Sequence, residues 1–166
     1  MFDGLKVADF AWVGVGPIIS KALADHGATV IHVESAVKTD LLRNLPPFKD
    51  AQPGIDRSQF FANFNTSKQG LKLELNEPAD LAVARRLADW ADVVVESFTP
   101  GTMARYGLDY ATLSARRTDL VMLSTCMRGQ TGPERHYTGF GNQGAALAGL
   151  VAITGWPDRA PAGPWG

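Results

Sequence analysis

The sequence predicts an α/β fold, with a Rossmann-like, mostly parallel sheet and helices on both of its faces. Three observations carry this prediction. Short apolar, β-branched segments alternate along the chain with segments whose apolar residues have helical spacing. Several of the apolar segments are uninterrupted, as in parallel strands covered on both faces. Their order is β-α-β, a long loop, β-α-β, α, β, α, which is typical of such sheets.

The first forty residues form one predicted β-α-β unit. An apolar run over 7–13 leads into the turn 14–17 and then into a helical pattern from 18 to 26. Pro17 suits the first helical position, where the N–H that proline lacks would have no partner. Gly27 ends the helix, and 29–34 supplies a second strand. The unpaired N–H groups and the dipole at the start of this helix favour an anion placed against residues 14–19.

This anion prediction has two alternatives. The glycines of the turn can serve packing and turning alone, as in any parallel α/β domain. A nicotinamide cofactor is the other, since Glu34 lies at a suitable distance to bind a ribose. Ile19 stands where the third glycine of the dinucleotide fingerprint is expected, and this weakens the nicotinamide interpretation.

A long charged loop over 35–58 separates this unit from the next. Loops of this length are usually functional, disordered or covered by a partner. The alternating leucines of 71–75 predict a short strand with Leu71, Leu73 and Leu75 on one face. The further predicted elements are a helix over 79–90 capped by 76–78, a strand over 91–95, short helices over 102–106 and 110–116, a strand over 120–125, a loop over 127–138, a helix over 139–153 and a connector over 155–166.

Composition limits the classes of protein to consider. With 166 residues, 45% of them hydrophobic and 20% charged, the chain suffices for one sizeable core. A net charge of -1 gives no reason to expect a nucleic acid or an anionic membrane surface as partner. No apolar run approaches the roughly 20 residues of a membrane helix, and no signal peptide opens the chain, so we expect a cytoplasmic protein. The lone Cys126 excludes an internal disulfide, and three scattered histidines predict no metal site.

Several phrases, in the same order along the chain, resemble one family. They are Leu5-Lys-Val-Ala-Asp-Phe10 with Gly16-Pro17, 23–34, Asp40-x-x-Arg43, Asn65-Thr-Ser-Lys68 followed by Leu-x-Leu, 91–101 and 107–113. Together they resemble the class III CoA-transferases, the carnitine dehydratase and bile-acid-inducible protein F type, which includes formyl-CoA transferase and alpha-methylacyl-CoA racemase. The resemblance implies that 1–166 is the amino-terminal, CoA-binding, Rossmann-like part, incomplete relative to the family, with the second domain and the C-terminal return absent.

The resemblance also implies a site for CoA or an acyl-CoA substrate. By position in the family, Gly14 and Val15 would lie beside the CoA, Leu73 and Phe98 would flank its adenine and pantetheine, and Arg105 and Tyr106 would reach its phosphates. A guanidinium just after a strand-end loop can bind a phosphate bidentately. From the residues alone, Arg105 is instead an exposed helix residue paired with Asp109, and Phe98 is a core residue.

The chemistry that the resemblance implies is nucleophilic catalysis by an aspartate, through an aspartyl-CoA thioester. We expect this aspartate just past Gly166, so no catalytic residue is assigned here, and Asp158 lies in a turn. Gly141 stands where the racemase branch carries its catalytic aspartate, which disfavours racemisation. Ser35 stands where family members carry a basic residue that helps to hold the nucleotide, and Lys38 is a candidate to compensate.

Three hypotheses follow from the sequence. The first is the CoA-binding part of an acyl-CoA:carboxylate CoA-transferase, inactive alone, whose partners are an acyl-CoA, a carboxylic acid and the remainder of the transferase or a second subunit. An interlocked homodimer is expected by resemblance. The second hypothesis is a non-catalytic CoA-binding or subunit-assembly module. The third is an NAD-dependent oxidoreductase.

Overall fold

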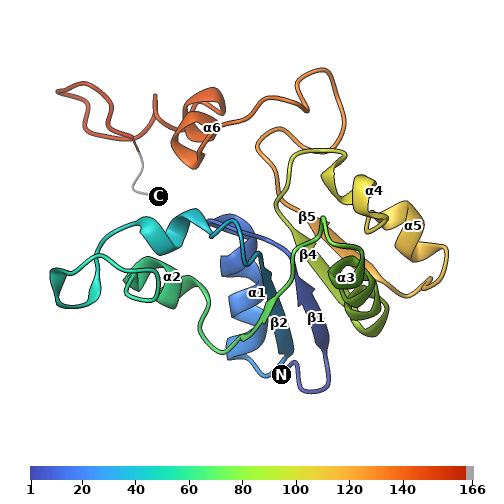
Figure 1. Cartoon of the computed structure of the whole chain (residues 1–166). Helices are drawn as coiled ribbons and strands as arrows, with labels where there is room; N and C mark the ends of the chain where they lie inside the picture. Colours follow the sequence, from blue (N-terminus) through green and yellow to red (C-terminus); the bar gives the residue numbers. More distant parts are fainter. Residues whose placement is uncertain (164–166) are drawn as a thin grey trace. The chain divides into compact units, whose positions relative to one another are not determined.

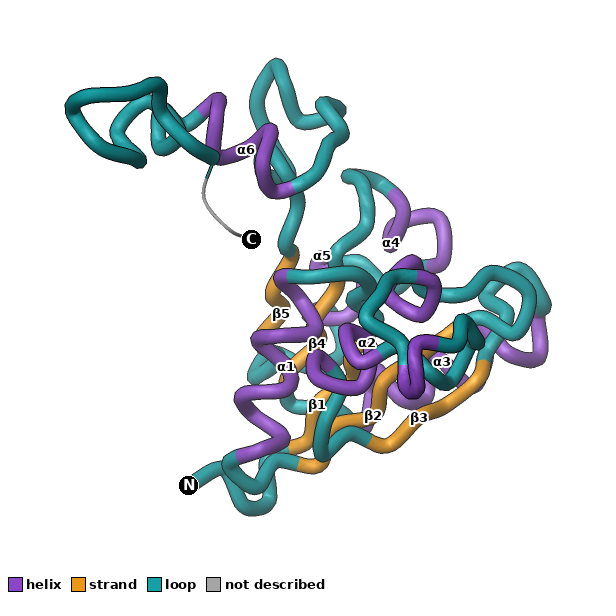
Figure 2. Tube along the Cα trace, turned by 90° about the vertical axis from the view of Figure 1, so that its left-hand side faces the viewer, coloured by secondary structure: helices purple, strands orange, loops and turns teal. Residues whose placement is uncertain are grey.

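The computed structural model describes residues 1–163 of the chain, which divides into two compact units, Met1–Thr125 and Cys126–Gly166. The first unit is built on a five-stranded sheet, whose strands are β1 (Lys6–Asp9), β2 (Thr29–Glu34), β3 (Gln69–Lys72), β4 (Val93–Glu96) and β5 (Val121–Ser124). Every neighbouring pair is parallel, and the order is β3-β2-β1-β4-β5 (Figures 1 and 2). The predicted α/β class and parallel sheet are confirmed.

Helices cover both faces of this sheet, as predicted. On one face lie α1 (Val15–Asp25) and the short α2 (Gln59–Phe64). On the other face lie α3 (Pro78–Trp90), α4 (Thr102–Tyr106) and α5 (Tyr110–Ser114). Figure 1 shows α1 and α3 on opposite sides of β1. The two α-helices that precede β3 therefore cover one face, and the three helices that follow β3 in this unit cover the other.

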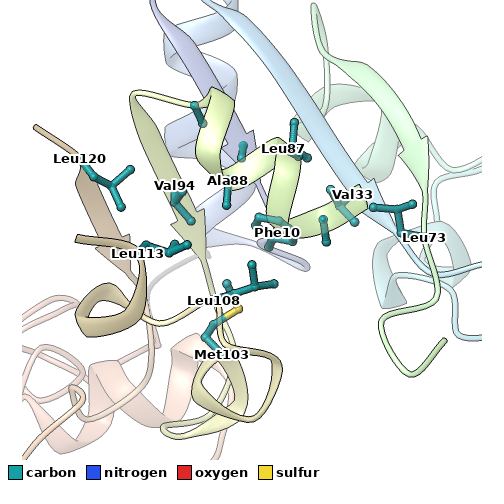
Figure 3. Close-up of a cluster of buried hydrophobic side chains, with 13 residues drawn as sticks. Phe10, Val33, Leu73, Leu87, Ala88, Val94, Met103, Leu108, Leu113 and Leu120 are labelled. Carbon is teal, nitrogen blue, oxygen red and sulfur yellow. The ribbon is translucent and has the colours of Figure 1, made fainter. Parts of the chain in front are cut away.

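The larger core lies between the sheet and α3, α4 and α5. Phe10, Val94 and Leu108 are nearly or fully buried there (Figure 3). A smaller cluster beneath α1 gathers Val7, Ala11, Ala24, Ala28, Val30 and Val95. Neighbouring residues of β1 and β4 contribute to opposite clusters, as the twofold alternation of strand side chains requires. Burial on both faces explains why these strands read as uninterrupted apolar runs.

The first strand ends earlier than the sequence predicts, at Asp9 instead of residue 13. The reason is a change of hydrogen-bond partner. The N–H of Phe10 still donates to the Val95 carbonyl at 2.8 Å, but the N–H of Ala11 donates to the Asp9 carboxylate at 3.0 Å. Beyond Phe10, side chains therefore accept the backbone N–H groups in place of the neighbouring strand. The apolar residues of 10–13 give no sign of this change in the sequence.

The helix that follows begins at Val15, three residues before the predicted start. Pro17 is therefore its third residue and not its first. This position also tolerates proline, because the N–H groups of the first helical turn have no intrahelical acceptor. The helix ends before Gly27, as predicted, where the N–H of Gly27 donates to the Ala24 carbonyl at 3.0 Å.

The alternating leucines lie partly outside the strand that they predict. Pairing in β3 covers residues 69–72, with Leu71 opposite Val33, and then stops. The N–H of Leu73 still donates to the Glu34 carbonyl at 2.9 Å. Leu71, Leu73 and Leu75 all contact the larger core, so their predicted common face is correct. At the next helix the N-cap is Glu77, inside the predicted segment 76–78, but its side chain forms no capping hydrogen bond.

The long charged loop is an ordered segment with two short 3-10 helices, Leu41–Asn44 and Lys49–Ala51. Ser58 fixes its far end, because the Ser58 hydroxyl lies 2.6 Å from the Leu42 carbonyl and 2.8 Å from the Leu45 carbonyl. The loop therefore folds back on itself before α2 begins.

In the second unit, the only helix of residues 126–163 is α6 (Gly141–Leu147), shorter than the predicted 139–153. It ends because Gly149 adopts a left-handed conformation with φ of 79°. The N–H of Leu150 donates to the Ala145 carbonyl at 2.9 Å, a bond that closes a helix C-terminus. No residue in 126–163 is buried.

Candidate anion-binding site at the switch point of the sheet

The strand order places a topological switch point between β1 and β4. The connection after β1 enters α1 on one face of the sheet, whereas the connection after β4 leads to α4 on the other face. The segments 10–14 and 97–101 therefore diverge at the carboxyl ends of two adjacent strands. Ligands of open parallel sheets bind in this crevice.

The turn that joins β1 to α1 is held from three directions. The N–H of Trp12 donates to the Ser97 hydroxyl at 2.8 Å, and that hydroxyl donates to the Trp12 carbonyl at 3.0 Å. The indole N–H of Trp12 donates to the Val33 carbonyl at 2.9 Å. The N–H of Val13 donates to the Asp40 carboxylate at 3.0 Å. The segment after β4, strand β2 and the long loop thus fix the position of this turn.

The first turn of α1 is open to a ligand. Gly14 is its N-cap and supplies no side-chain acceptor. Within residues 1–163, the N–H groups of Gly14 and Val15 donate to no protein acceptor, and the Val15 side chain is 65% exposed. These N–H groups and the helix dipole supply the donors and the positive potential that a phosphate or carboxylate requires.

Gly16 brings this helix close to the sheet. A Cβ at residue 16 would lie 2.3 Å from the Ala11 Cβ and 3.3 Å from the Thr125 hydroxyl, so a side chain there has no space. A Cβ at Gly14 would meet nothing within 4 Å. The packing role that the sequence leaves open for the glycines therefore applies to Gly16, and Gly14 remains available to a ligand.

Glu96 shapes the segment after β4. Its side chain is 2% exposed, and one of its carboxylate oxygens accepts the N–H of Phe98 at 2.8 Å. Burial raises the pKa of Glu96, although hydrogen bonds from Ser124 and the Phe98 N–H act in the opposite direction. The half-buried Phe98 ring lies 6.3 Å from the Trp12 ring and also packs against the larger core. The rings of Trp12 and Phe98 thus meet across the switch point.

Arg105 and Tyr106 lie on α4, beyond that segment. Arg105 is exposed, and its guanidinium carbon lies 5.6 Å from the centroid of the Tyr106 ring. Asp109, the partner expected from the residues alone, instead caps α5 through the Thr112 N–H at 3.3 Å. Within the described residues Arg105 forms no ion pair. The Tyr106 hydroxyl donates to the Asn76 side chain at 3.2 Å.

The six residues predicted to contact CoA thus divide by exposure. Val15 and Arg105 are exposed, Gly14, Phe98 and Tyr106 are half-buried, and Leu73 is buried. Leu73, Phe98 and Tyr106 all contact the larger core. Hydrogen bonds between Trp12 and Ser97 hold the segment that contains Gly14 beside the segment that contains Phe98. Their contact with CoA stays a prediction.

Glu34, the residue that a nicotinamide site would use, is already occupied. The Arg43 guanidinium donates to both of its carboxylate oxygens at 2.7 Å. Burial raises the pKa of Glu34, but the Arg43 hydrogen bonds and charge, together with the charges of His32 and Lys72, bring the pKa below its usual range. Arg43 also stacks on the Phe61 ring at 3.6 Å and pairs with Asp56 at 2.8 Å. A ribose diol would have to break this arrangement.

The residue after Glu34 is also engaged. The Ser35 hydroxyl donates to Glu74 at 2.7 Å and accepts the N–H groups of Val37 and Lys38. Lys38 is exposed at this turn. Its side chain is therefore accessible to a nucleotide, and its role there stays a prediction.

Sequence reasoning missed a buried polar network beneath α1. A single carboxylate oxygen of Asp9 accepts from the Ser20 hydroxyl at 2.7 Å, from Lys68 at 2.9 Å and from His32 Nδ1 at 3.0 Å. Lys68 also donates to the Pro17 carbonyl at 3.0 Å and to Asn65 at 2.8 Å. The network therefore ties α1 to strands β1 and β2 and to the segment 65–68 that leads into β3. The signal available in the sequence was an aspartate inside an apolar strand.

This network carries two unusual protonation environments. Burial raises the pKa of Asp9, but the hydrogen bond and charge of His32, the Lys68 charge and the Ser20 hydrogen bond together bring it below its usual range. Burial lowers the pKa of Lys68, although Asp9 opposes that shift. Within the described residues, His32 Nε2 is buried without a hydrogen-bond partner.

Two further properties concern only residues 1–163. No helix there is long and apolar enough to cross a membrane. No three side chains of the His, Cys, Asp and Glu types gather there in a way that could hold a metal ion. The absence of a metal stays a prediction for the whole chain.

Comparison with known proteins agrees with the resemblance found in the sequence. The profile of CoA-transferase family III matches residues 2–164. The chain belongs to this family. It is 35% identical over 159 residues to a succinyl-CoA--D-citramalate CoA-transferase of Chloroflexus aurantiacus. It is 38% identical over 164 residues to subunit BbsE of a succinyl-CoA:(R)-benzylsuccinate CoA-transferase of Thauera aromatica.

A solved structure shares the fold. A CAIB/BAIF family protein of Brucella suis superposes with a TM-score of 0.87 at 32% identity, covering 98% of this chain and 43% of that protein. The chain likewise covers 39% of the Chloroflexus relative and 40% of the Thauera relative, while 96% of this chain is matched by each. The family member described here thus spans less than half the length of these relatives.

Proposed function

We propose that this chain is the CoA-binding part of an acyl-CoA:carboxylate CoA-transferase. The observation that carries the proposal is the uncapped first turn of α1, fixed at the switch point of a CoA-transferase family III sheet. Its free N–H groups and positive dipole offer an anion site in the crevice where ligands of parallel sheets bind. The relatives named above are transferases of CoA between an acyl donor and a carboxylic acid.

In this proposal, the residues around the turn each contact a different part of CoA or support a residue that does. Gly14 and Val15 contribute backbone N–H groups beside the ligand. Arg105 contributes an exposed guanidinium without an ion-pair partner among residues 1–163, and Tyr106 holds that guanidinium by its ring face. Phe98 presents its half-buried ring to the pantetheine or adenine. Leu73, which is buried, acts through the core that it shares with Phe98.

The proposed reaction runs through an aspartate supplied by the remaining length of a longer protein or by a second subunit. Its carboxylate attacks the thioester carbon of the donor, forming an acyl-aspartyl anhydride and releasing CoA thiolate. The thiolate then attacks the aspartyl carbonyl, which gives an aspartyl-CoA thioester and frees the donor acid. The acceptor carboxylate repeats the two steps in reverse and leaves with the CoA. Backbone N–H groups stabilise each tetrahedral oxyanion.

Calorimetric titration of the 166-residue chain with CoA, acetyl-CoA and NAD tests this proposal. We expect binding of the two CoA species and none of NAD. Arg105→Ala should weaken CoA binding roughly tenfold or more, because a charged phosphate contact is lost. Arg116→Ala is the matched control, since Arg116 is similarly exposed but pairs with Asp89.

Two outcomes would contradict the proposal. Binding of NAD without CoA would favour the oxidoreductase alternative. Binding of none of the three ligands would show that the chain does not hold CoA by itself, and would favour the subunit-assembly module. That second candidate has one observation of its own, since the Thauera relative is named as a subunit.

A further inference from the structure

Asp40 is a fully buried carboxylate in the long loop between β2 and α2. Its side chain forms two hydrogen bonds with the backbone. One carboxylate oxygen accepts the N–H of Leu42 at 2.9 Å, and the other accepts the N–H of Val13 at 3.0 Å. The bond to Leu42 makes Asp40 the N-cap of the first 3-10 helix of the loop. The bond to Val13 reaches the turn in front of α1, 27 residues away.

Val13 is held in a backbone conformation that its side chain disfavours. Its φ is 68°, in the left-handed region, which β-branched residues rarely enter. Such a conformation persists only where its surroundings determine it, and it occurs most often at functional sites. Here the surroundings are the Asp40 bond to Val13 and the two Ser97 bonds to Trp12. The left-handed residue turns the chain just before the N-cap Gly14.

We propose that Asp40 is a positioning residue for the CoA site, an inference that rests on the proposed function. Asp40 holds Val13 in its left-handed conformation, so that the free N–H groups of Gly14 and Val15 face the ligand. The long loop is therefore part of the binding machinery although it contributes no ligand contact through Asp40. Both Asp40 oxygens accept N–H groups, so a carboxylate is required: an amide has one acceptor and would set an NH2 group against one of the two N–H donors.

A double-mutant cycle of Asp40→Asn with Val13→Gly tests this role. Asp40→Asn should speed amide hydrogen exchange at Val13 roughly tenfold and weaken CoA binding by a similar factor, because a buried bond to a charged acceptor is lost. Val13→Gly accepts the left-handed conformation without a side-chain clash. Glycine at residue 13 should therefore restore part of the CoA affinity lost in Asp40→Asn, and the two effects on affinity should not add.

Asp50→Asn is the matched control. Asp50 lies in the same loop and pairs with Arg57 at 2.9 Å, and its side chain is 67% exposed. It should change neither Val13 exchange nor CoA affinity. Additive effects of Asp40→Asn and Val13→Gly, or unchanged Val13 exchange in Asp40→Asn, would overturn the positioning role. If the wild-type chain binds no CoA while Val13 exchange responds as expected, the proposed function fails and Asp40 positions the turn alone.

Discussion

At the scale of single residues, the buried network beneath α1 has the largest consequence for stability. The side chains of Asp9 and Lys68 are 0% and 1% exposed, and they pair at 2.9 Å. Two charges taken out of water gain little net stability from their pairing, but removing one of them leaves the other uncompensated. A single substitution in this network therefore lowers the free energy of unfolding by more than the loss of one hydrogen bond.

Lys68→Met tests this expectation. The methionine fills a similar volume but leaves the Asp9 carboxylate buried without its cation. The free energy of unfolding should fall by about 3–5 kcal/mol, measured by urea denaturation at neutral pH. Lys72→Met, at an exposed lysine of β3, is the control and should change stability by less than about 0.5 kcal/mol. A loss of equal size in both variants would show that the pair does not matter.

Single residues also show where sequence reasoning stops. The turn and helix over 14–25 were predictable, because glycines, a proline and a helical pattern are contiguous in the chain. Ser97, Asp40 and Lys68 were not assigned these roles, because each acts on a segment 27 to 85 residues away. No local periodicity reports such a pairing. The matched phrases contained Asp9, Asp40 and Lys68, but a phrase does not say which side chains meet.

At the scale of elements, the sequence predicted which segments form helices and strands better than where they end. The ends of β1 and β3 are set by side chains and by neighbouring strands, since Asp9 and Ser97 take over the backbone donors after β1. Gly149 ends α6. It lies among other small residues, so the sequence did not mark it as the end of a helix. By contrast, α3 matches its prediction to one residue because its apolar stripe and Pro78 mark its extent.

One contact between elements predicts a pH dependence. Asp25, near the C-terminus of α1, accepts the Ser67 hydroxyl at 2.7 Å and the Thr66 hydroxyl at 3.1 Å, and it pairs with Lys21. These contacts join α1 to the segment that leads into β3. The Lys21 hydrogen bond and the Ser67 hydroxyl lower the pKa of Asp25 from 3.8 to about 2.

Asp25→Asn should therefore alter acid stability in a defined window. A carboxylate with a lowered pKa in the folded state stabilises the fold above its unfolded value, and this stabilisation is lost as pH falls from about 3.8 to about 2. The variant should be less stable than wild type at pH 6, and the difference should shrink through that window. Urea denaturation between pH 2 and 6 measures it, with Asp3→Asn as an exposed control. A difference that stays constant with pH would contradict the assignment.

At the scale of the whole molecule, stability is concentrated in the first unit. All five strands and both core clusters lie within Met1–Thr125. Residues 126–163 bury no side chain, and they leave Phe140, Leu147, Ile153 and Trp156 between 51% and 81% exposed. A segment that buries so little apolar surface cannot offset the entropy of ordering it.

Removal of residues 126–166 should therefore leave the fold of the first unit intact. A chain of residues 1–125 should unfold cooperatively, with a midpoint within about 4–8 °C of the full chain, equivalent to roughly 1 kcal/mol. Thermal unfolding followed by circular dichroism measures this change. Hydrogen exchange on the full chain supplies the matching observation, because the amides of α6 should exchange much faster than those of β1. A shortened chain without a cooperative transition would show that the second unit stabilises the sheet, and that the first unit depends on contacts beyond its own core.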